Sequence, residues 1–184
     1  MDPCSPLKTA YVEATSTWLC AGCVRPKPDV GPVDAHIQER APEGPLNFLS
    51  GCGVPLARKS FLFAFGDERI KRDLRLGEVF GPDGHRLDDW VTFRGKRRLI
   101  VRGSKHASYR VCPNCGRDVY FAMGTRYLYP EPPKNVELFE SDLGGLILPE
   151  SIATELNIGE LAGVTCERLK ALGQPKDGLP PVYF

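Results

Sequence analysis

Several features that would identify a function class are missing from this sequence. No apolar run approaches the roughly 20 residues of a membrane-spanning helix, so no membrane segment is expected. The first six residues lack the positive and then apolar pattern of a secretory signal, which predicts a cytoplasmic protein. Neither sign of charge dominates, because 24 basic residues stand against 23 acidic ones. This balance argues against a dedicated nucleic-acid binder and against a polybasic membrane anchor.

Recognisable catalytic motifs are missing as well. The sequence contains no phosphate-binding loop, dinucleotide fingerprint, nucleophile elbow or metalloprotease motif. Its three histidines, His36, His85 and His106, do not stand at metal-ligand spacing from one another. A cysteine–histidine hydrolase needs a thiol that a histidine activates across the fold, and no signature points to one. We therefore expect a protein that is not an enzyme.

The composition is that of a globular protein. Its 184 residues, 42% of them apolar, suffice for one domain with a hydrophobic core. No internal repeat divides the chain, so residues 1–184 are expected to form a single domain. Residues 24–45 are rich in proline and glycine, which predicts an irregular loop with one helical turn near residues 36–40. Residues 174–184 are predicted to form a flexible tail.

The most informative pattern is a pair of Cys-x-x-Cys motifs, Cys20-Ala-Gly-Cys23 and Cys112-Pro-Asn-Cys115. Four thiolates in two such pairs are the usual ligands of a tetrahedral structural zinc site, and soft sulfur ligands suit Zn²⁺. Gly116 directly follows the second pair and can supply the positive φ of a tight metal-binding turn. The sequence therefore predicts a closed structural site in which these four cysteines hold Zn²⁺.

Other interpretations of the cysteines stay open at this stage. The pairs could be unrelated thiols or a redox disulfide, since the fold must bring together two motifs that are far apart in the sequence. His36 or Cys52 could replace one of the four ligands. Cys4 and Cys166 are left over, and the apolar stretch around Cys166 predicts a small buried residue.

Periodicity and turn signals predict an α+β fold with a mainly antiparallel sheet, two or three short helices and a zinc knuckle. Gly81-Pro-Asp-Gly84 between β-forming residues predicts a hairpin. A second turn at residues 95–96 would continue this hairpin as a meander into the second cysteine pair. The other expected elements are strands over residues 9–18 and 164–169, a strand and turn over 138–148, and short helices over 67–76 and 150–156.

The segment 94–110 is basic and has aromatic neighbours at Trp90, Phe93 and Tyr109. Such a patch could bind RNA, DNA or an acidic protein. The solvated face of an antiparallel hairpin gives the same pattern, and acidic residues between positions 67 and 89 could pair with these bases. The cations are Arg94, Lys96, Arg97, Arg98, Arg102, Lys105 and Arg110.

The chain resembles the double-CxxCG motif family, which is known for its myxobacterial paralogues. The resemblance rests on both cysteine motifs, the second in the form Cys112-Pro-Asn-Cys-Gly-Arg-Asp118, and on a closing pattern. This pattern places a strand, a serine at the start of a short helix and a final strand in that order. Its sequence segments are Val136-Glu-Leu-Phe-Glu140, Leu146-Ile-Leu-Pro-Glu-Ser151 and Gly163-Val-Thr-Cys-Glu167.

Related closing units occur in immunity proteins of bacterial polymorphic toxin systems. The resemblance, which covers residues 112–169 and more loosely the first motif, therefore implies a cytoplasmic antidote that occludes the active site of a cognate toxin. Zinc would belong to its scaffold. Only the four cysteine positions carry over, and Val24 stands where the family has glycine. The alternative function is a zinc-ribbon-like nucleic-acid-binding module that uses residues 94–110.

Overall fold

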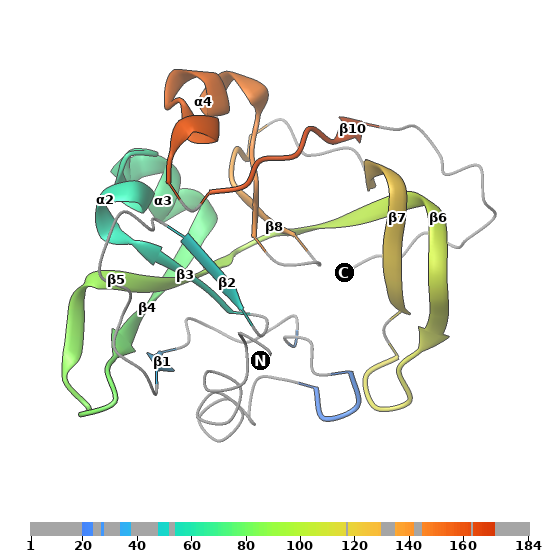
Figure 1. The fold of residues 1–184 in the computed structure, drawn as a ribbon, viewed down its shortest axis with the longest axis horizontal. Helices are drawn as coiled ribbons and strands as arrows, with labels where there is room; N and C mark the ends of the chain where they lie inside the picture. The colour runs from blue at the N-terminus through green and yellow to red at the C-terminus, as the bar shows by residue number, and fades with distance from the viewer. Residues whose placement is uncertain are drawn as a thin grey trace.

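The computed structural model describes residues 20–23, 27, 34–37, 48–51, 54–116, 118–129, 135–141, 145–162 and 164–171. Within these ranges the chain forms two five-stranded sheets, three short α-helices and one 3₁₀ turn (Figure 1). The pairings of the longest strands are antiparallel. The predicted α+β fold with a mainly antiparallel sheet and a few short helices is confirmed.

The first sheet contains β1 (Ala35–His36), β2 (Phe48–Gly51), β3 (Val54–Arg58), β4 (Leu74–Phe80) and β5 (Arg86–Gly95). Its spatial order is β1–β4–β5–β3–β2, and each pair except β1–β4 is antiparallel. β4 and β5 form the predicted hairpin. The Gly84 N–H donates to the Gly81 carbonyl oxygen at 3.0 Å, and Gly84 has a φ of 77°. Glycine adopts this left-handed conformation without a steric penalty.

Strand β1 takes the place of the start of the helical turn predicted near residues 36–40, while residues 38–40 lie outside the described residues. It pairs in parallel with β4, and the Ile37 N–H donates to the Phe80 carbonyl oxygen at 2.9 Å. Ala35 and Ile37 are buried in one cluster with Val79, whereas the residue between them is exposed. This alternation has the period of a strand, so burying both apolar residues on one face requires extended backbone.

The second sheet contains β6 (Arg98–Val111), β7 (Asp118–Tyr129), β8 (Phe139–Ser141), β9 (Leu146–Ile147) and β10 (Lys170–Ala171). Its spatial order is β10–β7–β6–β8–β9. β6 and β7 form a long antiparallel ribbon, and the loop at its tip carries the second cysteine pair (Figure 1). The predicted strand and turn over 138–148 corresponds to β8 and β9, which pair in antiparallel fashion.

The turn at residues 95–96 does not continue the first sheet as the predicted meander. β5 and β6 belong to different sheets, because the backbone here binds other segments. The Lys96 N–H donates to the Asp73 carbonyl oxygen at 2.8 Å, and the Glu140 N–H donates to the Arg97 carbonyl oxygen at 3.0 Å. A Cβ on Gly95 would lie 2.5 Å from the Glu140 nitrogen, so the crossing depends on a residue without a side chain.

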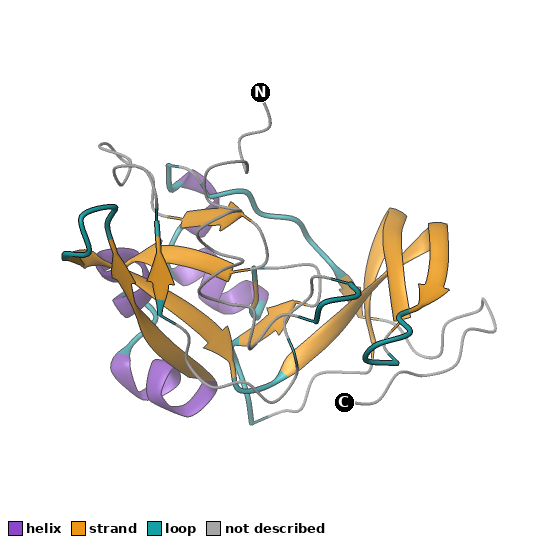
Figure 2. Ribbon diagram, turned by 90° about the horizontal axis from the view of Figure 1, so that it is seen from below, coloured by secondary structure: helices purple, strands orange, loops and turns teal. Residues whose placement is uncertain are grey.

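The helices gather around the first sheet, away from the β6–β7 ribbon (Figure 2). They are α2 (Lys59–Phe63), α3 (Asp67–Asp73), α4 (Glu150–Glu155) and the 3₁₀ turn η1 (Ile158–Glu160). α3 has acidic residues in its first turn and basic residues in its last, which suits the helix dipole. The predicted helix over 67–76 ends earlier, because Leu74 already belongs to β4.

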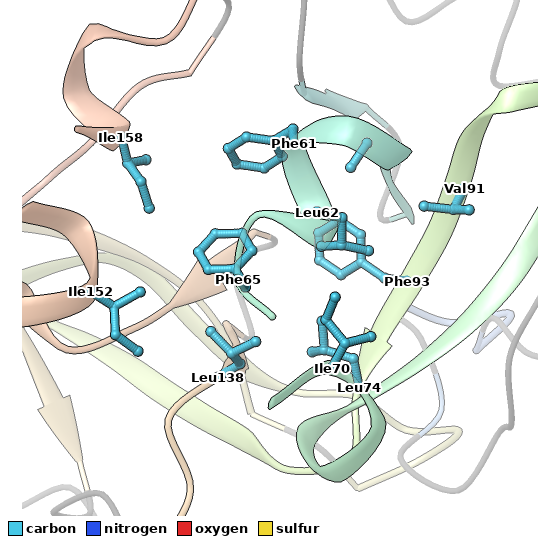
Figure 3. Packing of buried hydrophobic residues seen from close by; sticks show 11 residues of the cluster. Phe61, Leu62, Phe65, Ile70, Leu74, Val91, Phe93, Leu138, Ile152 and Ile158 are labelled. Carbon is cyan, nitrogen blue, oxygen red and sulfur yellow. The ribbon is translucent and has the colours of Figure 1, made fainter. Parts of the chain in front are cut away.

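The main hydrophobic core lies between these helices and the first sheet (Figure 3). A second cluster is centred on the other sheet and includes Leu99, Val101 and Phe139. Members of the main core include Phe61, Leu62, Phe65, Ile70, Leu74, Val91, Phe93, Leu138, Ile152 and Ile158.

The segment 164–169 is not the strand that was predicted. Val164 packs against the main core and Leu169 against the second cluster, so the segment crosses from one core to the other. Cys166 between them is exposed, which corrects the prediction that it is buried. Regular pairing begins only at β10, parallel to β7. The predicted strand over 9–18 and the predicted tail over 174–184 lie outside the described residues.

Candidate metal centre

The tip of the β6–β7 ribbon positions the second cysteine pair. β6 ends at Val111, and a turn over residues 113–115 leads back toward β7. Gly116 has a φ of 67°, and its N–H donates to the Cys112 carbonyl oxygen at 2.9 Å. The positive φ predicted for this glycine is therefore confirmed, and it allows the chain to reverse directly after Cys115.

The first pair lies in a turn over residues 21–23 that packs against the ribbon tip (Figure 1). Gly22, inside the first motif, lies very close to side chains of the second motif. A Cβ at this position would lie 2.9 Å from Cys112 Sγ and 3.0 Å from Asn114 Cγ. Sequence reasoning looked for a glycine after the motif and found Val24, and it missed the glycine within it. The signal that identifies Gly22 is spatial, since it depends on where the second motif lies.

The four predicted thiols come together in one cluster. All four Sγ atoms lie within 4.8 Å of one another. Two contacts of 3.7 Å join the motifs, one between Cys20 and Cys112 and one between Cys23 and Cys115. Four sulfurs at about 2.3 Å from a central zinc ion are about 3.8 Å apart in a tetrahedron. The cluster could therefore hold a metal ion.

The local electrostatics favour the thiolate form that a metal needs. The backbone N–H groups of Cys23 and Gly22 lower the pKa of the Cys20 thiol to about 6, although burial opposes the shift. Burial also opposes ionisation of Cys112, but hydrogen bonds from the backbone of Asn114 and Cys115 outweigh it and lower its pKa. The two turns thus supply oriented N–H donors to the sulfurs that lie deepest.

The alternative ligands do not join this cluster where they are described. His36 is exposed on β1, and its ring stacks on Phe80 with 4.9 Å between ring centroids. Cys52, Cys4 and the His106 side chain lie outside the described residues. Within the described part of the chain, the group of side chains placed to hold a metal consists of the four cysteines alone.

The basic segment 94–110 does not present all of its cations to solvent. Arg94 and Arg98 bind one buried carboxylate, that of Glu140 on β8. Arg94 Nε donates to both carboxylate oxygens at 2.9 and 3.0 Å, and Arg98 Nη2 donates to one of them at 2.8 Å. The Gly95 N–H adds a further bond of 3.1 Å. Sequence reasoning missed Glu140, since nothing local in the sequence relates it to these arginines.

Comparison of the chain with protein-family models, with curated proteins and with solved structures found no match. Among the described residues, no helix is long and apolar enough to cross a membrane.

Proposed function

We propose that this chain is an immunity protein, a cytoplasmic antidote that binds a cognate toxin and occludes its active site. The observation that carries the proposal is the four-thiol cluster, because it unites the two motifs on which the family resemblance depends. The first part of the closing pattern near the C-terminus supports it as well, although the final strand predicted over 164–169 is not formed. β8 and β9 are followed by α4, with Ser151 in its first turn, as in the closing unit of that family.

The metal in this proposal is Zn²⁺ in a structural role. Four thiolates fill all four positions of a tetrahedral ion, so no position is left for a water molecule or a substrate. Soft sulfur ligands favour zinc over magnesium or calcium, which prefer oxygen. Cys20 and Cys112 are only 5% and 1% exposed, as expected of ligands that belong to a scaffold.

An inhibitor of this kind acts by covering the toxin with a complementary surface. Interfaces of this class commonly bury about 1,600 Å² in total, and complementary charge speeds their formation. The metal would then keep the turn of residues 20–23 and the ribbon tip in one fixed arrangement. A fixed arrangement lowers the entropy lost on binding.

The proposal is tested by expressing the genes that neighbour this one, each alone and together with this chain. We expect one neighbour to arrest growth alone, and we expect this chain to restore growth and to co-purify with its product. Exposed Cys166 offers a matched control, since Cys166→Ser should rescue as well as the wild type. Persistent arrest while the folded chain is abundant would count against an immunity role.

The nucleic-acid alternative is weakened by the burial of Arg94 and Arg98 against Glu140. These arginines stabilise the junction between the sheets, so they add nothing to an exposed basic patch. A measurement of generic DNA and RNA binding against salt concentration tests this alternative, because phosphate contacts give a steep salt dependence.

A further inference from the structure

We propose that Cys23 and Cys115 form a redox modification site, at which an oxidant of the peroxide class joins them in a disulfide while Cys20 and Cys112 stay reduced. The proposal concerns the same cluster as the proposed zinc site. It rests on that assignment only for the release of metal, since the disulfide itself follows from the placement of the thiols.

The cluster has an inner and an outer side. Cys20 and Cys112 form the inner side and are buried. Cys115 is exposed and Cys23 is half-buried, and they form the outer side. Residues 113, 114 and 116 around Cys115 are exposed too, so a small oxidant reaches this sulfur directly from water. Exposure favours oxidation at Cys115, whereas the lowered pKa belongs to the buried Cys20, which an oxidant in water reaches less readily.

The outer thiols are also placed to react with each other. Their sulfurs are 3.7 Å apart, so they must approach each other by less than about 2 Å to form a disulfide bond of about 2.05 Å. The contact joins the first motif to the second, so the product is a cross-link between motifs. The resulting bond would tie the turn of residues 20–23 to the tip of the β6–β7 ribbon.

Formation of the disulfide takes two steps. The Cys115 thiolate attacks one oxygen of hydrogen peroxide, the O–O bond breaks, and a sulfenic acid and hydroxide result. The Cys23 thiolate then attacks the sulfenic sulfur, the S–O bond breaks, and a second hydroxide leaves. Two protons from solvent convert the hydroxides to water. The two sulfurs lose two electrons in total, and the peroxide gains them.

Oxidation would replace the metal-mediated link between the two cysteine motifs with a covalent disulfide link. Cys23 and Cys115 no longer offer thiolates, so only Cys20 and Cys112 remain as ligands and the metal is released. The new covalent bond keeps the two motifs together after the release. Reduction by a dithiol returns all four thiolates, and added zinc can then bind again.

The test uses the wild-type protein after its metal content has been measured. The protein is treated with increasing hydrogen peroxide, the remaining thiols are alkylated, and peptides covering all seven cysteines are mapped by mass spectrometry. A chromogenic chelator records released zinc in parallel. We expect the Cys23–Cys115 disulfide to appear first, with one zinc released per disulfide. Cys166→Ser should behave in the same way, because this exposed cysteine lies outside the cluster.

A first disulfide within either motif, between the buried thiols, or to Cys166 would overturn the proposal. Oxidation without a disulfide would overturn it too. The same experiment tests the redox site and the zinc site separately. If the purified protein lacks zinc but forms the Cys23–Cys115 disulfide, the zinc proposal is wrong and the redox proposal is supported. If the protein contains zinc but forms a different disulfide first, the redox proposal is wrong and the zinc proposal is supported. The toxin experiment is independent of both.

Discussion

Gly22 lies so close to Cys112 that a Cβ on the glycine would stand 2.9 Å from the cysteine Sγ. Real Cβ atoms do not approach sulfur this closely, so Gly22→Ala must displace the Cys112 sulfur or the Asn114 side chain. We expect the variant to bind zinc on the order of 10-fold more weakly, because displaced ligand geometry costs affinity. Competition with a chromogenic chelator measures the change.

Gly159→Ala is the matched control for this variant. It also adds one methyl group to a glycine, but nothing lies within 4 Å of the added Cβ. We expect its zinc affinity to equal that of the wild type. If both variants bound zinc as tightly as the wild type, the close approach at Gly22 would have no bearing on the site.

The buried Glu140 supplies a second prediction. Its carboxylate binds Arg94 and Arg98, and the three side chains are 5%, 4% and 10% exposed. Glu140→Gln leaves these two buried cations without their shared negative charge. We expect a loss of about 3–5 kcal/mol in the free energy of unfolding, since breaking one partner of a buried ion pair is costly. Urea denaturation followed by fluorescence measures it.

Glu150→Gln is the control for this effect. Glu150 also accepts a hydrogen bond from an arginine, Arg168, but both side chains are well exposed. Exposed pairs contribute about 0–1 kcal/mol, so a small change is expected. Equal losses in the two variants would mean that the burial of Glu140 has no energetic consequence.

The parts of the fold that sequence analysis predicted are those with a local cause. The turn at Gly81–Gly84 and the positive φ of Gly116 are both encoded by a few adjacent residues. The grouping of the cysteines was predictable for a different reason, because four thiols of this spacing favour one shared site. In each case the relevant chemistry is visible within the motif itself.

The parts that were not predicted depend on partners far away in the sequence. β1 is a strand because Ala35 and Ile37 are buried beside β4, and the surrounding prolines gave no indication of this pairing. The change of sheet at Gly95 depends on Glu140, which lies on β8. Tertiary contacts of this kind override local propensity, so a single sequence could not reveal them.

A third prediction concerns acid stability and the buried carboxylate of Asp73. Burial opposes its ionisation, but hydrogen bonds from Arg72 and from the N–H groups of Glu137 and Leu138 prevail and hold its pKa below the ordinary value of 3.8. A hydrogen bond from Arg72 likewise lowers the pKa of Glu137 below its ordinary 4.5. Both groups therefore bind fewer protons in the folded state than in the unfolded state.

The sign of the effect follows from linkage. Because the folded pKa values lie below the unfolded ones, the stabilisation is complete above about pH 5 and declines as the pH falls through 4.5 and 3.8. Asp73→Asn should lower stability at pH 7 and give a flatter decline between pH 5 and 3. Urea midpoints across this range measure it, with the exposed Asp89→Asn as control. A slope as steep in Asp73→Asn as in the wild type would exclude Asp73 as a source of the acid sensitivity.

The last prediction concerns removal of the metal. Cys112→Ser replaces a ligand that is 1% exposed, and the lost coordination should remove folding free energy, because a structural metal binds only the folded chain. We expect the melting temperature to fall by about 5–10 °C, which corresponds to a few kcal/mol in a protein of this size.

Chelation should lower the melting temperature of the wild type by a similar amount and leave that of Cys112→Ser unchanged, since that variant has no metal site left to empty. Cys166→Ser should respond to the chelator as the wild type does. Because the chelator and the substitution act on the same site, their effects should not add. Additive losses, or zinc content in Cys112→Ser equal to that of the wild type, would show that the metal is held elsewhere.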